Sequence, residues 1–159
     1  MNGEVTYQHI GRIHTPFTCK EETPIQGIYA PDSVGTVEVF PEYAEGLQDL
    51  EGFSHLILLY HFHRAEPCSL LKKPFLDDEP KGIFAIRHFN RPNPLGLSIV
   101  RLEKIKGNVL TVGEVDVLDG TPLLDIKPYM PDFDIRDRTR EGWYKGASNR
   151  EYYDRLKGS

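Results

Sequence analysis

The stretch SHLILLYHFHR, residues 54–64, shows the clearest strand pattern in the chain. Successive side chains of a β-strand point to opposite faces. One face therefore carries His55, Ile57, Leu59, His61 and His63, and the other carries Leu56, Leu58, Tyr60 and Phe62. The sequence predicts a central strand over Leu56–Phe62. At seven residues, this apolar run is shorter than the roughly 20 residues that a membrane-spanning helix needs.

Five other segments read as strands, and Gly- or Pro-containing turns lie between them. They are Val5–Ile13, Thr36–Phe40, Gly82–Arg87, Leu97–Ile105 and Val109–Leu118. A short helix is expected to begin at Pro41, because Tyr43, Leu47 and Leu50 form one apolar stripe. No long helical pattern separates the strands. We therefore expect a mainly β fold, a single small antiparallel β-barrel with short peripheral helices.

The charged residues are unevenly distributed along the 159 residues. The chain has 19 Lys and Arg against 24 Asp and Glu, a formal net charge of −5, with a mean hydropathy of −0.44. Residues 1–60 carry two basic and nine acidic side chains, whereas residues 61–110 carry nine and five. The total charge argues against binding nucleic acid by bulk positive charge, but the middle segment can offer a local anion-binding surface. A solvated face is the alternative.

The cysteines, the histidines and the N-terminus each exclude a class of protein. Cys19 and Cys68 form no CxxC pair, so we expect two reduced thiols rather than a disulfide framework or a zinc site. On the central strand only His61 and His63 are close enough to share an ion, and we expect no metal. The N-terminal residues lack the basic and apolar regions of a secretory signal, which favours a cytoplasmic protein.

The segment GIFAIRHFNRPNPLGLS, residues 82–98, concentrates basic and amide side chains. Pro92 and Pro94 fix the backbone and restrict Arg91 and Asn93 to extended conformations. The planar guanidinium group of arginine suits a carboxylate or a phosphate. The segment is either an anion-binding loop or a rigid turn with exposed basic residues.

The segment DVLDGTPLLDIKPYMP, residues 116–131, contains strong turn residues at Asp119–Pro122. Asp119 can accept a hydrogen bond from a ribose hydroxyl, with the N–H groups of Gly120 and Thr121 close to a ligand. Equally, Asp119 can cap its own turn. Neither a GxGxxG sequence nor a phosphate-binding loop is present, which argues against a Rossmann-type site.

Taken together and in this order, GFSHLILLYHFHR, GIFAIRHFNRPNPLGLS and DGTPLLDIKPYMP resemble the TsaA-like or TrmO family. The resemblance covers about residues 6–133. It implies a non-Rossmann β-barrel methyltransferase that binds S-adenosylmethionine and forms a homodimer. The implied activity is methylation of N6 of N6-threonylcarbamoyladenosine at position 37 of tRNA, next to the anticodon. We expect the barrel domain over residues 1–135 and an extension over 136–159, with a short helix that begins at a capping box, Ser148–Glu151.

The resemblance also implies a set of cofactor-binding residues. They are Pro24, Gln26, Gly27, Phe62, His63, Arg87, Leu97, Asp119, Gly120, Thr121 and Pro122. We expect Arg87 to bind the methionyl carboxylate, Asp119 to bind a ribose hydroxyl, and backbone groups around His63 and Leu97 to bind the adenine edge. The loop at Pro24–Gly27 departs from the family pattern, since it lacks a basic residue and one position.

The acceptor side of the site is less defined by the sequence. Candidates for the base, or for stabilising charge on the acceptor nitrogen, are His63, Arg91, Asp125, Lys127 and Tyr129. Asn93 is a candidate for orienting the base edge. Contacts to the anticodon loop are expected from Phe89 and the basic residues of 87–91, together with Arg136, Arg138 and Arg140. Two alternatives are a module that senses S-adenosylmethionine and a methyltransferase with another acceptor.

Overall fold

Two compact units make up the part of the chain that the computed structural model describes, residues 3–74 and 76–144. The first unit comprises residues 3–64 and 94–129, and the second comprises residues 65–93 and 130–144. The second unit thus combines segments from both sides of the boundary that the sequence suggests at residue 135. The capping box at Ser148 and its helix lie outside the described residues.

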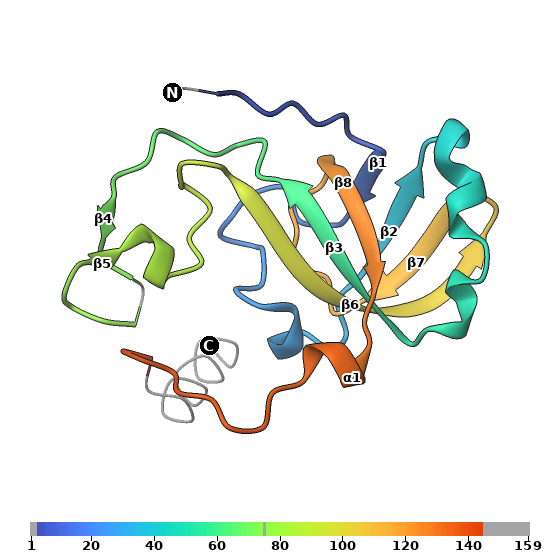
Figure 1. Ribbon diagram of the computed structural model, residues 1–159. Coiled ribbons are helices and arrows are strands. Elements are labelled where there is room, and N and C mark those ends of the chain that lie inside the picture. Colours follow the sequence, from blue (N-terminus) through green and yellow to red (C-terminus); the bar gives the residue numbers. More distant parts are fainter. Residues whose placement is uncertain (1–2, 75, 145–159) are drawn as a thin grey trace. The chain divides into compact units, whose positions relative to one another are not determined.

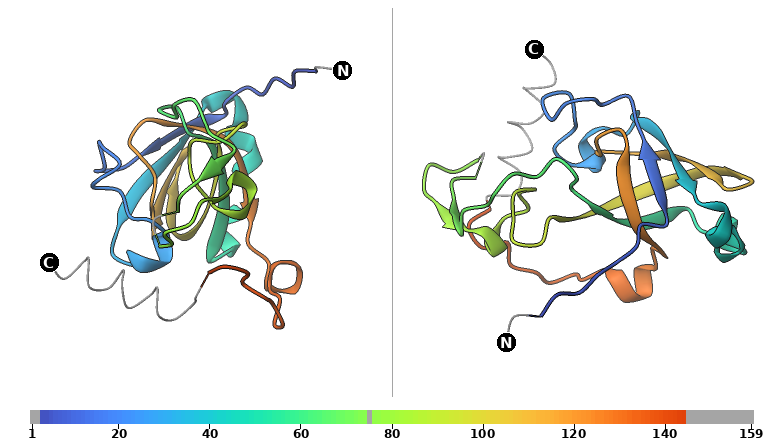
Figure 2. Two further views of the ribbon diagram at one scale, coloured as in Figure 1. Left: turned by 90° about the vertical axis from the view of Figure 1, so that its left-hand side faces the viewer. Right: turned by 90° about the horizontal axis from the view of Figure 1, so that it is seen from above.

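A closed barrel of six antiparallel strands forms the first unit (Figure 1). The strand order is β1-β2-β7-β6-β3-β8, and its closure confirms the mainly β barrel that the strand pattern predicts. Its strands are β1 (Gly11–His14), β2 (Val34–Val39), β3 (His55–His61), β6 (Leu95–Lys106), β7 (Val109–Gly113) and β8 (Thr121–Pro128). The first and last of these, β1 and β8, lie side by side in Figure 2 and close the barrel, with Ile13 opposite Thr121.

The interior of the barrel is filled by the inward faces of the strands. Leu56, Leu58 and Tyr60 of β3 are at most 3% exposed, whereas the residues between them are partly exposed, which confirms the predicted alternation. Every strand contributes, and the other fully enclosed core side chains include Ile13, Val37, Val100, Leu110, Val112 and Leu123. Burial of each such side chain contributes about 1.5–3 kcal/mol to folding.

Three of the predicted strands differ from the observed ones. The strand expected over Val5–Ile13 begins only at Gly11, where pairing with β2 starts. The strand expected over Val109–Leu118 ends at Gly113, because Glu114 adopts a left-handed backbone conformation with φ of 59°. The segment expected as a strand over Gly82–Arg87 instead forms the short β5 (Lys81–Gly82) and a 3-10 helix, η4 (Ile83–Ala85).

The sixth barrel strand is β8, which the sequence shows only as a turn with residues following it. Prolines discourage a strand prediction because they lack an N–H donor. Here Pro122 and Pro128 stand at the second and last positions of β8, where the ladder tolerates them. The predicted number of strands was therefore correct for the barrel, but the segment 82–87 was predicted as a strand in place of β8.

The helix expected from Pro41 is two 3-10 helices, η2 (Pro41–Leu47) and η3 (Leu50–Gly52). Asp49, with φ of 68°, interrupts them. A third, η1 (Gly27–Tyr29), follows the loop at Pro24–Gln26. No helix in the described ranges has the length and apolar character required to cross a membrane.

The second unit holds together around a two-stranded sheet and an aromatic contact. Strand β4 (Leu71–Lys72) pairs with β5, and a short helix, α1 (Pro131–Asp134), begins the segment 130–144. Trp143 Nε1 donates a hydrogen bond to the Ala85 carbonyl (2.8 Å), and the Lys81 ammonium lies 6.0 Å from the centre of the Trp143 ring. These contacts attach the late segment 130–144 to residues 65–93.

Gly96 allows a prediction about barrel stability. It lies opposite Tyr60 in the β3–β6 pairing, and a Cβ atom added at this position would overlap the Tyr60 ring. We expect Gly96→Ala to lower the free energy of unfolding by about 1–3 kcal/mol, measured by urea denaturation. Gly46→Ala is the control, because no atom lies within 4 Å of its added Cβ. Equal effects of the two substitutions would contradict the prediction.

Candidate functional site

The turn at Asp119–Thr121, between β7 and β8, is held in place by the end of β1. The N–H of Asp119 donates to the Phe17 carbonyl (2.8 Å) and the N–H of Gly120 to the Ile13 carbonyl (2.9 Å). Gly120 has φ of 80°, a conformation that glycine adopts without steric cost. The N–H groups of Asp119 and Gly120 therefore serve the fold, so the ligand-binding potential of the turn lies in its side chains.

The Asp119 carboxylate joins the turn to β1 through one of its oxygens. Oδ1 accepts a hydrogen bond from the Thr15 N–H (3.1 Å) and lies 3.7 Å from Nδ1 of His14. Asp119 therefore does not cap its own turn through this oxygen, which instead accepts from Thr15, 104 residues away in the sequence. Among the described residues Oδ2 has no hydrogen-bond partner, which leaves it able to accept from a ligand hydroxyl.

His63 lies beside the same turn, just past the end of β3. Its Nδ1 is 3.5 Å from Oγ1 of Thr121, a long contact, and that hydroxyl donates its proton to the Leu118 carbonyl (2.7 Å). A neutral imidazole ring keeps one nitrogen with a free lone pair, which can accept a proton. Partial burial lowers the pKa of His63. Nearby Arg64, His61 and Arg12 lower it further, while Asp119 opposes them. The neutral imidazole, a proton acceptor, is thus favoured.

The loop at Pro24–Gly27 is attached to the barrel by Asp116. The Gly27 N–H donates to Oδ2 of Asp116 (3.0 Å), and Oδ1 of Asp116 accepts from the Ser98 hydroxyl. Since the Ser98 proton is used there, the buried Tyr60 hydroxyl, 2.8 Å away, donates to Ser98 Oγ. Burial, and then the negative charge of Asp116, raise the pKa of Tyr60, which keeps the phenol protonated.

Close packing restricts the same loop. A Cβ atom at Gly27 would overlap the carbonyl oxygen of Glu114, so only glycine fits against the β7 end. Asp116 was not among the residues that the sequence suggested. Its signal was an acid between Val115 and Val117, both of which are buried. The position of the loop therefore depends on a hydrogen-bonded chain that begins in the barrel interior.

The outer face of the barrel places Leu97 in a row with Asp125. Leu59 of β3 lies opposite Leu97 of β6 on one side and opposite Asp125 of β8 on the other. Leu97 is 53% exposed. Of the candidates for the acceptor side, Asp125 is therefore the one that shares a cross-strand row with a predicted cofactor residue.

The remaining candidates on β8 lie far from His63 within one chain. Lys127 is six residues after Thr121, about 20 Å along the strand. Its ammonium forms an ion pair with Asp125 Oδ2 (3.1 Å), and the Tyr129 N–H donates to the His55 carbonyl (3.1 Å), at the start of β3. His63 and Lys127 therefore cannot act together on one atom of a ligand bound to a single barrel.

In the second unit, Arg91 has a structural role that leaves Arg87 available. Nη1 of Arg91 donates to the carbonyls of Ile86 (2.9 Å) and His88 (3.2 Å), which orders the loop around Arg87. Arg87 itself is exposed, and no ion pair or hydrogen bond of its side chain occurs in the described parts of the chain. Of the two arginines, Arg87 thus has the free guanidinium group that an anionic ligand requires.

Other side chains of the second unit expected to contact RNA are partly engaged. Phe89 stacks on the His88 ring at 4.2 Å between centroids. Arg136 donates to the carbonyls of Phe133 and Ile135 (both 2.8 Å), whereas Arg138, Arg140 and Asn93 are exposed.

The described residues contain two cysteines without a disulfide and no group of side chains suited to a metal ion. Cys19 and Cys68 are both free thiols. Across residues 3–74 and 76–144, no three His, Cys, Asp or Glu side chains are grouped so that they could hold a metal ion.

Comparison with known proteins identifies one family over most of the chain. The model of the tRNA-methyltransferase O N-terminal domain matches residues 12–135. Solved structures agree. The crystal structure of TrmO from Pseudomonas aeruginosa superposes with a TM-score of 0.76 at 36% identity, over 98% of this chain and 76% of that one.

Curated relatives carry names of two kinds. A protein of Pyrococcus abyssi named "Probable S-adenosyl-L-methionine-binding protein" is 56% identical over 87% of this chain and 76% of its own length. The mouse tRNA (adenine(37)-N6)-methyltransferase is 34% identical over 83% of this chain, but the match spans only 32% of the mouse protein. An S-adenosyl-L-methionine-binding protein of Archaeoglobus fulgidus is 38% identical over 79% of this chain and 89% of its own.

The hydrogen-bonded chain through Asp116 predicts a local effect on the loop. In Asp116→Asn only one oxygen remains, so the amide cannot accept from both Ser98 and Gly27. We expect a loss of about 1–3 kcal/mol in the free energy of unfolding and faster hydrogen exchange at the Gly27 amide, measured by NMR. Ser33→Ala removes another contact of the same segment, Ser33 Oγ to the Val115 carbonyl (2.7 Å), and should leave Gly27 protected. Unchanged exchange at Gly27 in Asp116→Asn would contradict this assignment.

Proposed function

This chain belongs to the family of the tRNA-methyltransferase O N-terminal domain, and we propose that it methylates tRNA with S-adenosylmethionine as the methyl donor. We further propose that the acceptor is N6 of N6-threonylcarbamoyladenosine at position 37, in the anticodon loop. The relative named as a methyltransferase of adenine 37 supports this acceptor. The structural observation that carries the proposal is the turn at Asp119–Thr121, which places a free carboxylate oxygen beside a neutral His63.

The residues present fit S-adenosylmethionine by their chemistry. In the barrel unit, Asp119 Oδ2 is a free acceptor for a ribose hydroxyl. In the second unit, taken by itself, Arg87 has an exposed guanidinium group of the kind that binds a carboxylate. The loop at Pro24–Gly27, fixed through Asp116, and the turn at Asp119–Pro122 are both parts of the barrel unit. Of the predicted apolar cofactor residues, Phe62 follows β3 and packs edge-on against the Tyr60 ring (5.4 Å between centroids), whereas Leu97 of β6 is 53% exposed.

Bound S-adenosylmethionine would supply an electrophilic methyl group: the lone pair of the acceptor N6 would form the new N–C bond, the C–S bonding pair would stay on sulfur, and N6 would lose its proton to a base. The protein must hold the two reactants in line and accept that proton. His63 is the group that we assign to the proton, because its lowered pKa favours the neutral ring, whose unprotonated nitrogen can accept it. The other basic candidates, Arg91 and Lys127, are engaged in hydrogen bonds or ion pairs.

We propose that the protein acts as a homodimer in the cytoplasm, where its tRNA substrate functions. The outer face of β6 supports a second copy, since Leu95, Leu97 and Ile99 are 50%, 53% and 44% exposed. Ile57 and Leu59 of β3 lie opposite Ile99 and Leu97 and extend this apolar surface. Two-fold pairing would cover it. Light scattering of the purified protein should give the mass of two chains.

The activity is tested by methyl transfer from tritiated S-adenosylmethionine. We expect label in tRNA that carries the threonylcarbamoyl group and none in tRNA that lacks it. Calorimetric titration should show that Arg87→Ala weakens cofactor binding about tenfold, on the order of 1.4 kcal/mol. Lys104→Ala removes an exposed charge from β6 and is the control. Cofactor binding without label in either tRNA would favour a sensing module or another acceptor, and no binding would overturn the proposal.

The role of His63 predicts a pH dependence. Only the neutral ring accepts a proton, so kcat/KM should rise with pH through the pKa of His63 and level off above it. Because that pKa is lowered, the rise should lie below the ordinary histidine value of about 6.5. His63→Gln should remove this rise and reduce the rate about 10²–10⁴-fold. An unchanged profile in His63→Gln would show that another group takes the proton.

A further inference from the structure

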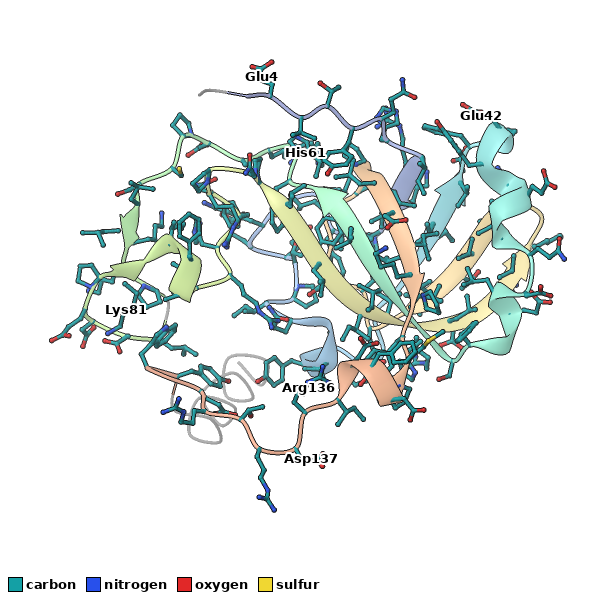
Figure 3. The ribbon with its side chains drawn as sticks, viewed as in Figure 1. Glu4, Glu42, His61, Lys81, Arg136 and Asp137 are labelled. Carbon is teal, nitrogen blue, oxygen red and sulfur yellow. The ribbon has the colours of Figure 1, made fainter. Side chains whose placement is uncertain are left out.

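Two arginines and a histidine, here called the cationic cluster, lie near the turn at Asp119–Thr121: Arg12, Arg64 and His61. Arg12 Nη1 donates to the Gly120 carbonyl (3.3 Å). Arg64 Nη1 donates to the Thr18 carbonyl (2.7 Å), next to Phe17, whose carbonyl accepts from the Asp119 N–H. His61, labelled in Figure 3, is the last residue of β3. It follows Tyr60, which pairs with Leu123 of β8. The cluster thus draws on β1, β3 and the segment after β3.

Nearby carboxylates do not neutralise this cluster. Glu38 lies opposite Arg12 in the β1–β2 pairing, yet its Oε2 is 3.1 Å from Nε2 of His14. Asp119 is likewise next to His14, at 3.7 Å. In residues 3–74 and 76–144, no member of the cluster forms an ion pair with a carboxylate. Arg101, Lys81 and Lys127 all do so.

The guanidinium groups of Arg12 and Arg64 are held in place and still have free hydrogen-bond donors. Each has one donor committed to a backbone carbonyl, out of the five that arginine offers, and both side chains are exposed. The remaining donors form the planar arrangement that binds phosphate oxygens. A fixed side chain also loses less conformational entropy when it binds.

The basic side chains of the cationic cluster lie close enough to His63 to affect its pKa. Besides burial, Arg64, His61 and Arg12 lower its pKa, and Asp119 is the group that opposes them. An anion bound between these cations would relieve the repulsion. The pKa of His63 should therefore rise when an anion binds to the cationic cluster.

We propose that the cationic cluster binds backbone phosphates of the RNA strand that carries the acceptor nucleotide. This inference rests on the proposed function, since it assumes an RNA substrate at the turn. A chain of net charge −5 repels RNA as a whole, so the strand needs a local set of unpaired cations. Phosphate contacts fix the position of the strand, and the modified base then supplies specificity.

The test measures binding of a fluorescent RNA hairpin with the sequence of a tRNA anticodon stem-loop, by anisotropy at several salt concentrations. Arg12→Gln and Arg64→Gln remove one charge each, and glutamine can still donate to the backbone carbonyl. We expect each to weaken binding about three- to tenfold and to reduce the salt slope by about 0.7, the value for one phosphate of a single strand. Lys104→Gln and Lys106→Gln, exposed at the β6–β7 hairpin, are the matched controls and should change affinity less than twofold.

NMR titration of His63 gives a second measurement. Its pKa should rise in free Arg12→Gln, because a repelling charge is gone, and should rise in the wild type when the RNA hairpin binds. Inorganic phosphate at the same ionic strength distinguishes a single-anion site from a strand, since a site for single anions would reproduce the shift.

Several results would overturn the inference. Wild-type salt slopes in both arginine variants, equal losses in the lysine controls, or no binding of the hairpin by the wild type would do so. Failure of the proposed function is separate. If RNA binds through Arg12 with the expected salt dependence but no methyl is transferred, the cationic cluster is supported and the proposed methyltransferase activity is wrong. If methyl transfer occurs and is unaffected in Arg12→Gln, the activity is supported and the role of the cationic cluster is wrong.

Discussion

The pairing of β8 with both β1 and β3 is the constraint on which the site depends. It closes the barrel through Ile13 and Thr121 and sets Leu123 opposite Tyr60. Because β8 begins immediately after the turn at Asp119–Gly120, closure also brings that turn against the end of β1 and beside His63. The charged and polar groups of the candidate site therefore come from three strands that are distant in sequence and adjacent in the barrel.

Fixation of the loop at Pro24–Gly27 follows a different route, from the interior outward. A buried tyrosine, a serine and an aspartate form one hydrogen-bonded chain that ends at the Gly27 amide. A Rossmann fold presents phosphate-binding N–H groups at a helix N-terminus. In this barrel, by contrast, the N–H groups of Gly27 and Gly120 are used within the protein, which leaves side chains such as Asp119 as the groups available to a ligand.

Much of the fold was predictable from the sequence, because alternation along β3 reflects burial directly. The strand that closes the barrel was missed, because Pro122 and Pro128 make β8 look unlike a strand and its long-range pairing leaves no local signal. The DGTP turn was suggested by its turn residues and Arg87 by the family resemblance, and both roles stay predictions, whereas Asp116 was missed. Its importance lies in contacts with Ser98 and Gly27, which are 18 and 89 residues away in the chain. Which candidates share an end of the barrel likewise depended on register, which separates His63 from Lys127.

Closure through strands so far apart in the chain has a consequence for biosynthesis. Arg12 and Gly120 are 108 residues apart, so the contact between them cannot form until most of the chain has left the ribosome. Within the first 60 residues β1 can pair with β2, but the other edge of β1 must wait for β8. Contacts between residues so far apart in the sequence also slow folding, because the entropy of closing a long loop is lost before the strand pairing that stabilises it can form. The turn at Asp119–Thr121 therefore reaches its partners on β1 only after residues 119–121 have been synthesised.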